Sequence, residues 1–213
     1  MTPLPRALLA LAPDQPIPLA RHGVLIPSGR IGETDIRGAI VMVETDSDIA
    51  TLQMALAASA SMIALRGYRT GADLQRLATL LCVAEAECGC PEGSTSILAM
   101  TDGLLPAPAA RESLAEKSKR LAGLVWDQRA LALTLGARRT RTEAGEWTPS
   151  FTSARAATLL TAAAARVPAY DSVFDLDDDA LAQACRQSRA EGFFGQLTAT
   201  ETQTAVVEAL YAG

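Results

Sequence analysis

The chain has 213 residues, of which 49% are apolar and 20% are charged, enough for one large domain or two small ones. Its formal net charge of −5 argues against nucleic acid as the main partner, because phosphate binding needs a basic face. The four cysteines suggest no disulfide framework, which favours a reducing, cytoplasmic compartment, and the sequence predicts no membrane segment.

The first part of the chain differs in composition from the rest. Residues 1–38 are rich in proline and glycine, and we expect an irregular segment with one apolar run, "GVLIP" at 23–27. From Ala39 onward, apolar runs alternate with stretches whose apolar residues recur at helical spacing. The runs that predict buried strands are 39–44, 61–67, 95–103, 123–127, 169–175 and 193–199, and each is followed by a predicted helix, including one over 110–123.

Six successive strand–helix units predict parallel strands with right-handed crossovers. No glycine-rich phosphate loop follows any strand, so a dinucleotide-binding sheet lacks its usual motif. We therefore expect a TIM-type (β/α) barrel over residues 39–213. Such barrels usually need about 250 residues, so this one is expected to be incomplete or to have an irregular first part.

The ends of the predicted strands supply the candidate site residues, because TIM barrels place their chemistry at the carboxyl ends of the strands. Glu44, Arg66 and Arg129 are the candidates for binding a ligand. Each has a structural alternative: Glu44 as a capping or solvated residue, and Arg66 in an ion pair. No catalytic residue is assigned from the pattern alone.

Three stretches resemble the citrate lyase beta-subunit-like proteins of the HpcH/HpaI aldolase group, in a divergent form that is shortened at its N-terminus. They are "DLQRLATLLCVAEAECG…SILAMTDG", "LAGLVWDQRALALTLGA" and "VPAYDSVFDLDDDALAQACRQSRAEGFFGQLTATETQTAVVEAL". The resemblance implies a barrel that makes or breaks carbon–carbon bonds in acyl-CoA thioesters or oxo-acids with a divalent metal, usually Mg²⁺. The ion polarises a carbonyl and stabilises an enolate.

The side chains with which this family binds its metal and substrate are not found at the aligned positions of this chain. The two metal-binding acids of the family fall on Met100 and Ala130, although the neighbouring Thr101 and Leu131 match. The other positions at which a family side chain is replaced are Met42 (Arg), Gly67 (Lys), Arg69 (Glu) and Thr200 (His). Thioether and methyl groups cannot hold Mg²⁺, which needs oxygen ligands.

We therefore interpret the chain as a non-catalytic or repurposed relative, with no cofactor expected. It would act as a supporting subunit of an active paralogue or as a homo-oligomer. One alternative is an active Mg²⁺-dependent lyase whose ligands have shifted to Asp102 and Asp127. Another is a binding protein for an acyl-CoA or a dicarboxylate.

Overall fold

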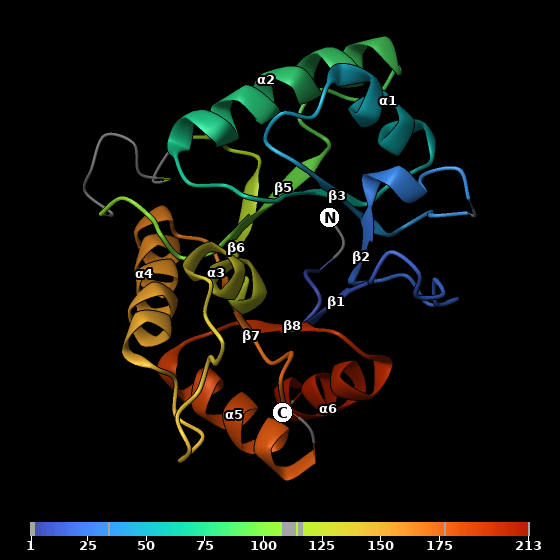
Figure 1. The fold of residues 1–213 in the computed structure, drawn as a ribbon. Coiled ribbons are helices and arrows are strands. Elements are labelled where there is room, and N and C mark those ends of the chain that lie inside the picture. The colour runs from blue at the N-terminus through green and yellow to red at the C-terminus, as the bar shows by residue number, and fades with distance from the viewer. Residues whose placement is uncertain (1–2, 34, 108–113, 115–116, 177, 213) are drawn as a thin grey trace.

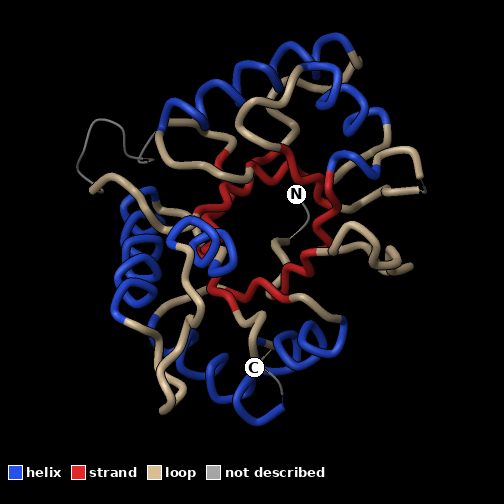
Figure 2. Tube along the Cα trace, viewed as in Figure 1, coloured by secondary structure: helices blue, strands red, loops and turns tan. Residues whose placement is uncertain are grey.

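The computed structural model describes residues 3–33, 35–107, 114, 117–176 and 178–212, which form a closed barrel of eight parallel strands. The strands are β1 (Ala7–Ala10), β2 (Val24–Pro27), β3 (Ile40–Val43), β4 (Met62–Leu65), β5 (Ser96–Thr101), β6 (Leu121–Trp126), β7 (Ala169–Ser172) and β8 (Gly195–Thr198). They follow chain order around the ring, and β8 pairs with β1 to close it (Figure 2). The prediction of a TIM-type barrel is confirmed.

The barrel is complete, so the expectation of an incomplete one is wrong. Residues 1–38 contribute β1, β2 and a 3₁₀ helix at Ser28–Arg30, and the other described residues of this part are irregular. The strand β1 escaped notice because it has four residues between Pro5 and Pro13. So short a run has no alternation or flanking helix that would mark it as a strand. One of its partners, β8, lies at the other end of the chain, in register Ala7↔Gln196, and the other, β2, pairs with it through Leu9↔Val24.

Six α-helices and one 3₁₀ helix accompany the strands in the described residues: η1 (Ser28–Arg30), α1 (Ile49–Ala57), α2 (Gly71–Glu87), α3 (Gln128–Leu135), α4 (Pro149–Ala165), α5 (Asp178–Glu191) and α6 (Glu201–Tyr211). Figure 1 shows α1 and α2 side by side outside β3 to β5, and α5 beside α6 outside β7 and β8. Six of the fourteen residues of the helix expected over 110–123 lie outside the described residues. The prediction is wrong for 117–123, where 117–120 form a bend and a turn and β6 begins at Leu121. None of the helices is long and apolar enough to cross a membrane in the part of the chain that is described.

Two apolar layers fill the space inside and outside the ring. The interior holds alternate strand residues: Leu8, Leu25, Ile40, Met42, Ala64, Leu98, Met100, Val125, Tyr170 and Leu197. The residues between them face outward and pack under the helices, because successive side chains of a strand point to opposite faces. Gly195 has no room for a side chain, since a Cβ there would lie 2.1 Å from the carbonyl oxygen of Arg6.

Candidate functional site

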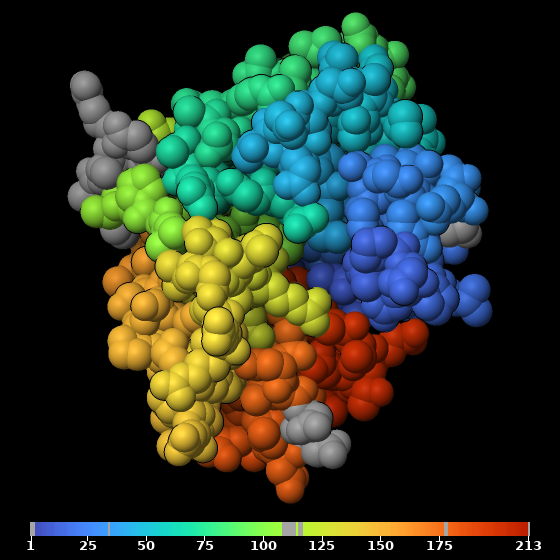
Figure 3. Space-filling view, viewed as in Figure 1, coloured from blue at the N-terminus to red at the C-terminus, as the bar shows by residue number. Residues whose placement is uncertain are grey.

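The barrel mouth is the first place to look for a site, because four neighbouring strands, β3 to β6, are each followed directly by a charged residue there. Figure 1 views the barrel along its axis, with α3 lying in front of β6. In the space-filling view of the same face, the yellow residues of α3 and the segment after it cover much of the centre (Figure 3). Two of the candidates belong to this helix, because Arg129 lies in its first turn and Asp127 is its N-cap.

Glu44 and Arg66 follow β3 and β4, and the structure pairs them with each other. A guanidinium nitrogen of Arg66 lies 3.0 Å from a carboxylate oxygen of Glu44. The side chain of Arg66 is 46% exposed, and that of Glu44 is 55% exposed. Such an exposed pair is worth little free energy, so either side chain can exchange this partner for a ligand.

Asp102 follows β5 and is held by side chains from the loop after β4 and from α3. Arg69 donates to its carboxylate at 2.7 Å, and the Thr134 hydroxyl of α3 donates to the same oxygen at 3.3 Å. The second carboxylate oxygen accepts the backbone N–H of Leu104. The side chain of Asp102 is only 7% exposed, so this carboxylate is committed to internal partners.

Asp127 follows β6 and begins α3. Its carboxylate accepts the backbone N–H groups of Arg129 and Ala130, as a helix N-cap does. Burial raises the pKa of Asp127, although those two N–H groups and the charges of Arg66 and Arg129 act in the opposite direction. The structure thus brings Arg66, Arg129 and Asp127 into one electrostatic group.

Arg129 is exposed at the start of α3, and its guanidinium lies over the ring of Phe174, 3.8 Å from the ring centre. The ring comes from the loop after β7, so this contact connects two neighbouring strand ends. A guanidinium held flat in this way keeps its N–H groups oriented for a planar anion such as a carboxylate. Phe174 was not recognised as a site residue in the sequence, because an aromatic residue after a strand is usually core.

The mouth does not fit a Mg²⁺ ion in the way the family resemblance implies. Met42 and Met100 stand inside the barrel at the end of β3 and β5, 6% and 3% exposed, and both offer a thioether. Among the described residues, no three His, Cys, Asp or Glu side chains are grouped as a metal site. Asp102 and Asp127 each directly follow the paired residues Thr101 and Trp126, so their backbones are neighbours.

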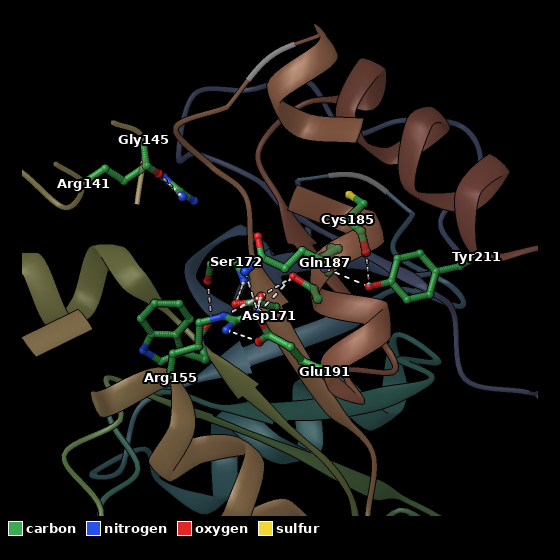
Figure 4. Close-up of polar contacts among 12 residues, drawn as sticks. Arg141, Gly145, Arg155, Asp171, Ser172, Cys185, Gln187, Glu191 and Tyr211 are labelled. Atoms are coloured by element: carbon green, nitrogen blue, oxygen red, sulfur yellow. Dashed lines mark hydrogen bonds and ion pairs between the residues drawn. The ribbon is translucent and has the colours of Figure 1, made fainter. Parts of the chain in front are cut away.

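A second polar cluster lies outside the ring, between β7, α4 and α5 (Figure 4). Arg155 of α4 donates to the carboxylate of Asp171 at 2.8 Å and to Glu191, and Ser188 of α5 donates to Asp171 as well. Asp171 is 2% exposed. This cluster was missed in the sequence, although one signal was present: an aspartate within an apolar strand, "AYDSV", needs a buried partner.

Comparison with known proteins shows similarity at the level of structure. No protein-family model and no curated protein sequence matches the chain. RipC from Yersinia pestis is 19% identical with a TM-score of 0.69, and the match covers 97% of this chain and 94% of that one. The citrate lyase beta subunit from Mycobacterium tuberculosis, complexed with oxaloacetate and magnesium, is 17% identical with a TM-score of 0.66, covering 99% and 98%.

Malate synthase from Haloferax volcanii, as a lead(II) complex, is also similar, at 17% identity and a TM-score of 0.65. That match covers 88% of this chain and 63% of the malate synthase chain. These three proteins share the barrel with low sequence identity. The chain therefore has the fold of the citrate lyase beta subunits and their barrel relatives, as the order of its segments predicted.

Proposed function

We propose that this chain is a citrate lyase beta-like barrel that does not perform metal-dependent carbon–carbon lyase chemistry. The observation that carries the proposal is the state of the mouth carboxylates. Asp102 is paired with Arg69 and Thr134, and Asp127 caps α3. A Mg²⁺ ion would have to displace the Arg69 guanidinium and the α3 N-terminus, which is costly for a cation that dehydrates reluctantly.

The family resemblance supports the same proposal. Its two metal-binding acids align with Met100 and Ala130, and Met100 is buried among apolar side chains inside the barrel. Without a divalent ion, an enolate would lack its main electrostatic stabiliser. The mouth instead offers two arginines, Arg66 and Arg129, which suit the recognition of a carboxylate without turnover.

The test is a thermal-unfolding series with Mg²⁺ or Mn²⁺, each alone and with oxaloacetate or acetyl-CoA. A site filled at a hundred times its Kd would add about 2.7 kcal/mol to the native state. For a chain of this size that is a rise in Tm of about 5–10 °C. We expect no metal-dependent rise. A rise of that size would overturn the proposal.

A second candidate function is an active Mg²⁺-dependent lyase whose metal ligands are Asp102 and Asp127. The register between β5 and β6 favours it. Asp102 and Asp127 follow residues that are paired across β5 and β6, and two carboxylates with water can be sufficient for Mg²⁺. If metal raises the Tm, the variant Asp102→Asn/Asp127→Asn distinguishes the candidates. Asparagine keeps a capping oxygen at position 127, so the loss of the metal effect would identify the carboxylate charges as the ligands.

Binding at the mouth and assembly are tested separately. Calorimetry with a dicarboxylate and with acetyl-CoA, in the absence of metal, should give heat that is lost in Arg129→Met, while the exposed Arg186→Met serves as the control. If neither the dicarboxylate nor acetyl-CoA binds, the proposal that the mouth recognises a carboxylate is ruled out. The prediction of a homo-oligomer or a supporting subunit is checked by light scattering, and a stable monomer with no partner would contradict it.

A further inference from the structure

The two helix pairs on opposite sides of the barrel differ in their charge. Figure 1 shows α1 beside α2 outside β3 to β5, and α5 beside α6 on the far side of the ring. The second pair exposes charged side chains to water: Asp179, Arg186, Glu191, Glu201 and Glu208. In contrast, α1 has none, because no charged residue occurs over 49–65. A helix that is apolar all round is normally covered on every side.

The exposed stripe of α1 consists of apolar residues only. Ala50, Met54 and Ala57 recur at i, i+4 and i+7, so they lie on one face of the helix. All three are exposed, and Met54 is 49% exposed. The two alanines are small, so a second helix has room to approach on either side of Met54. This face therefore has the composition of a helix interface.

The neighbouring helix α2 adds no free charge to this side of the molecule. Its four charged side chains each have a hydrogen-bond partner within the chain: Asp73, Arg76, Glu85 and Glu87. Val83, one of its outward residues, is 42% exposed. Covering α1 and α2 would therefore leave no charge without a partner, which is the main cost of burying a helix surface.

A groove runs along the other side of α1. It has a volume of about 430 Å³ and lies between α1 and the segment that connects β2 with β3. Ile31, Ile36, Met54 and Ala57 supply its apolar lining. The described part of this connection contains η1 and no α-helix. The groove thus occupies a place that an α-helix covers in most strand–helix units of a barrel.

The rim of the groove indicates what covers it, because it carries one acid and one base. Asp35 and Arg37 both line the groove, and the side chain of Asp35 is 64% exposed although Arg21 lies 3.3 Å away. A protruding methionine, a hollow, an acid and a base on one surface are complementary to a copy of that surface turned about a twofold axis. In that arrangement Met54 enters the partner's groove, and Arg37 faces the partner's Asp35.

We propose that α1 and this groove form the interface of a symmetric dimer of this chain. The 17 residues of α2 extend about 25 Å, and two adjacent helices are about 20 Å wide, so the helical face covers about 500 Å². A standard interface buries about 800 Å² on each partner. The dimer is therefore reversible, with a Kd in the micromolar range. It gives a surface to the homo-oligomer in the proposed function and is independent of the chemistry at the mouth.

Sedimentation velocity of the full chain from about 1 to about 300 µM tests the proposal. The mass should rise from one chain to two and no further, because a twofold contact is closed. Met54→Glu places a charge from each copy in the interface and should weaken association at least about tenfold. Ala190→Glu adds the same charge at an exposed position of α5 and should leave association unchanged. A monomer at every concentration, growth beyond two chains, or an unweakened dimer in Met54→Glu would overturn the proposal.

A charge exchange at the rim tests the twofold pairing. Asp35→Arg alone should weaken the dimer several-fold, because two like charges then face each other across the axis. Asp35→Arg/Arg37→Asp restores opposite signs and should recover most of the affinity, and failure to recover would refute the pairing. Circular dichroism checks that each variant is folded. Thermal unfolding with Mg²⁺ reports on the mouth separately, so the loss of this inference and the loss of the proposed function are distinguishable.

Discussion

The ion pairs of the barrel mouth and those of the barrel wall are built differently. At the mouth, Glu44 and Arg66 are about half exposed, and Arg69 is 53% exposed. In the wall, Glu85 is fully buried against Arg120, and Asp171 is 3% exposed against Arg155. Burial makes a missing partner expensive, whereas exposure lets water replace it. The wall charges therefore hold the fold, and the mouth charges are available to a ligand.

The largest effect should come from breaking a wall pair on one side only. Arg155→Met leaves the Asp171 carboxylate buried with only Ser188 and a backbone N–H. We expect the free energy of unfolding to fall by about 3–5 kcal/mol, as when one partner of a buried pair is removed. Urea denaturation followed by circular dichroism measures this.

A matched double variant sharpens the result. Arg155→Met/Asp171→Asn removes the orphaned charge while keeping an oxygen for Ser172, so it should recover part of the lost stability. If the single variant lost less than about 1 kcal/mol, the wall pair would be no stronger than an exposed one, and the contrast between the two regions would fail.

The next largest effect should be the loss of stability when Glu85 is protonated at low pH. Burial alone would raise the pKa of this carboxyl, but hydrogen bonds from Arg120 and from the backbone N–H groups of Thr95 and Gly93 outweigh it and lower the pKa to about 2. The unfolded chain has the ordinary value of 4.5. Because the folded pKa is the lower one, this stabilisation is complete above about pH 4.5 and is lost as the pH falls toward 2.

Urea denaturation between pH 5 and 3 tests this prediction. The wild type should lose about 2 kcal/mol from this group across the window, since one pKa unit corresponds to about 1.4 kcal/mol and about 1.5 units of the titration fall between pH 4.5 and pH 3. Glu85→Gln should be less stable at neutral pH. Its free energy of unfolding should also depend less steeply on pH, by the equivalent of about one proton. An unchanged slope in that variant would show that other carboxyls dominate the acid transition.

The smallest effect is expected at the mouth. Arg66→Met should change the free energy of unfolding by less than about 1 kcal/mol, because its partner Glu44 remains in contact with water. A double-mutant cycle with Glu44→Gln measures the coupling between the two side chains directly. A coupling above about 2 kcal/mol would make this pair a structural one and would remove Arg66 from the ligand candidates.

Much of the barrel could be read from local patterns. Five strands lie within the runs predicted for them, such as Ile40–Val43 within 39–44, because a strand buried on both faces is a continuous apolar run. The sixth, β6, overlaps its predicted run 123–127 but begins two residues earlier. Gly192, with φ of 107°, directly follows α5, where a positive φ favours glycine. The 23–27 run proved to contain β2, whereas β1 needed its partners β8 and β2 to be recognisable.

The candidate site, like the fold, could be predicted only in part from the sequence. The strand ends placed Glu44, Arg66, Asp102 and Asp127 at the mouth, because a parallel barrel puts all carboxyl ends on one face. Their partners could not be predicted: Arg69 reaches Asp102 from another loop, and Phe174 supports Arg129 from the loop after β7. Such pairs depend on side-chain directions and on neighbours that are distant in sequence.

By itself, the sequence determined the parallel α/β class and the order of most strand–helix units. These features follow from hydrophobic periodicity and residue chemistry, which are local. Only the tertiary structure decided that residues 7–10 close the ring, that each mouth carboxylate already has a partner, and that Arg155 reaches Asp171 between α4 and β7. Closure and pairing arise from contacts between segments far apart in the chain, and no local pattern records them.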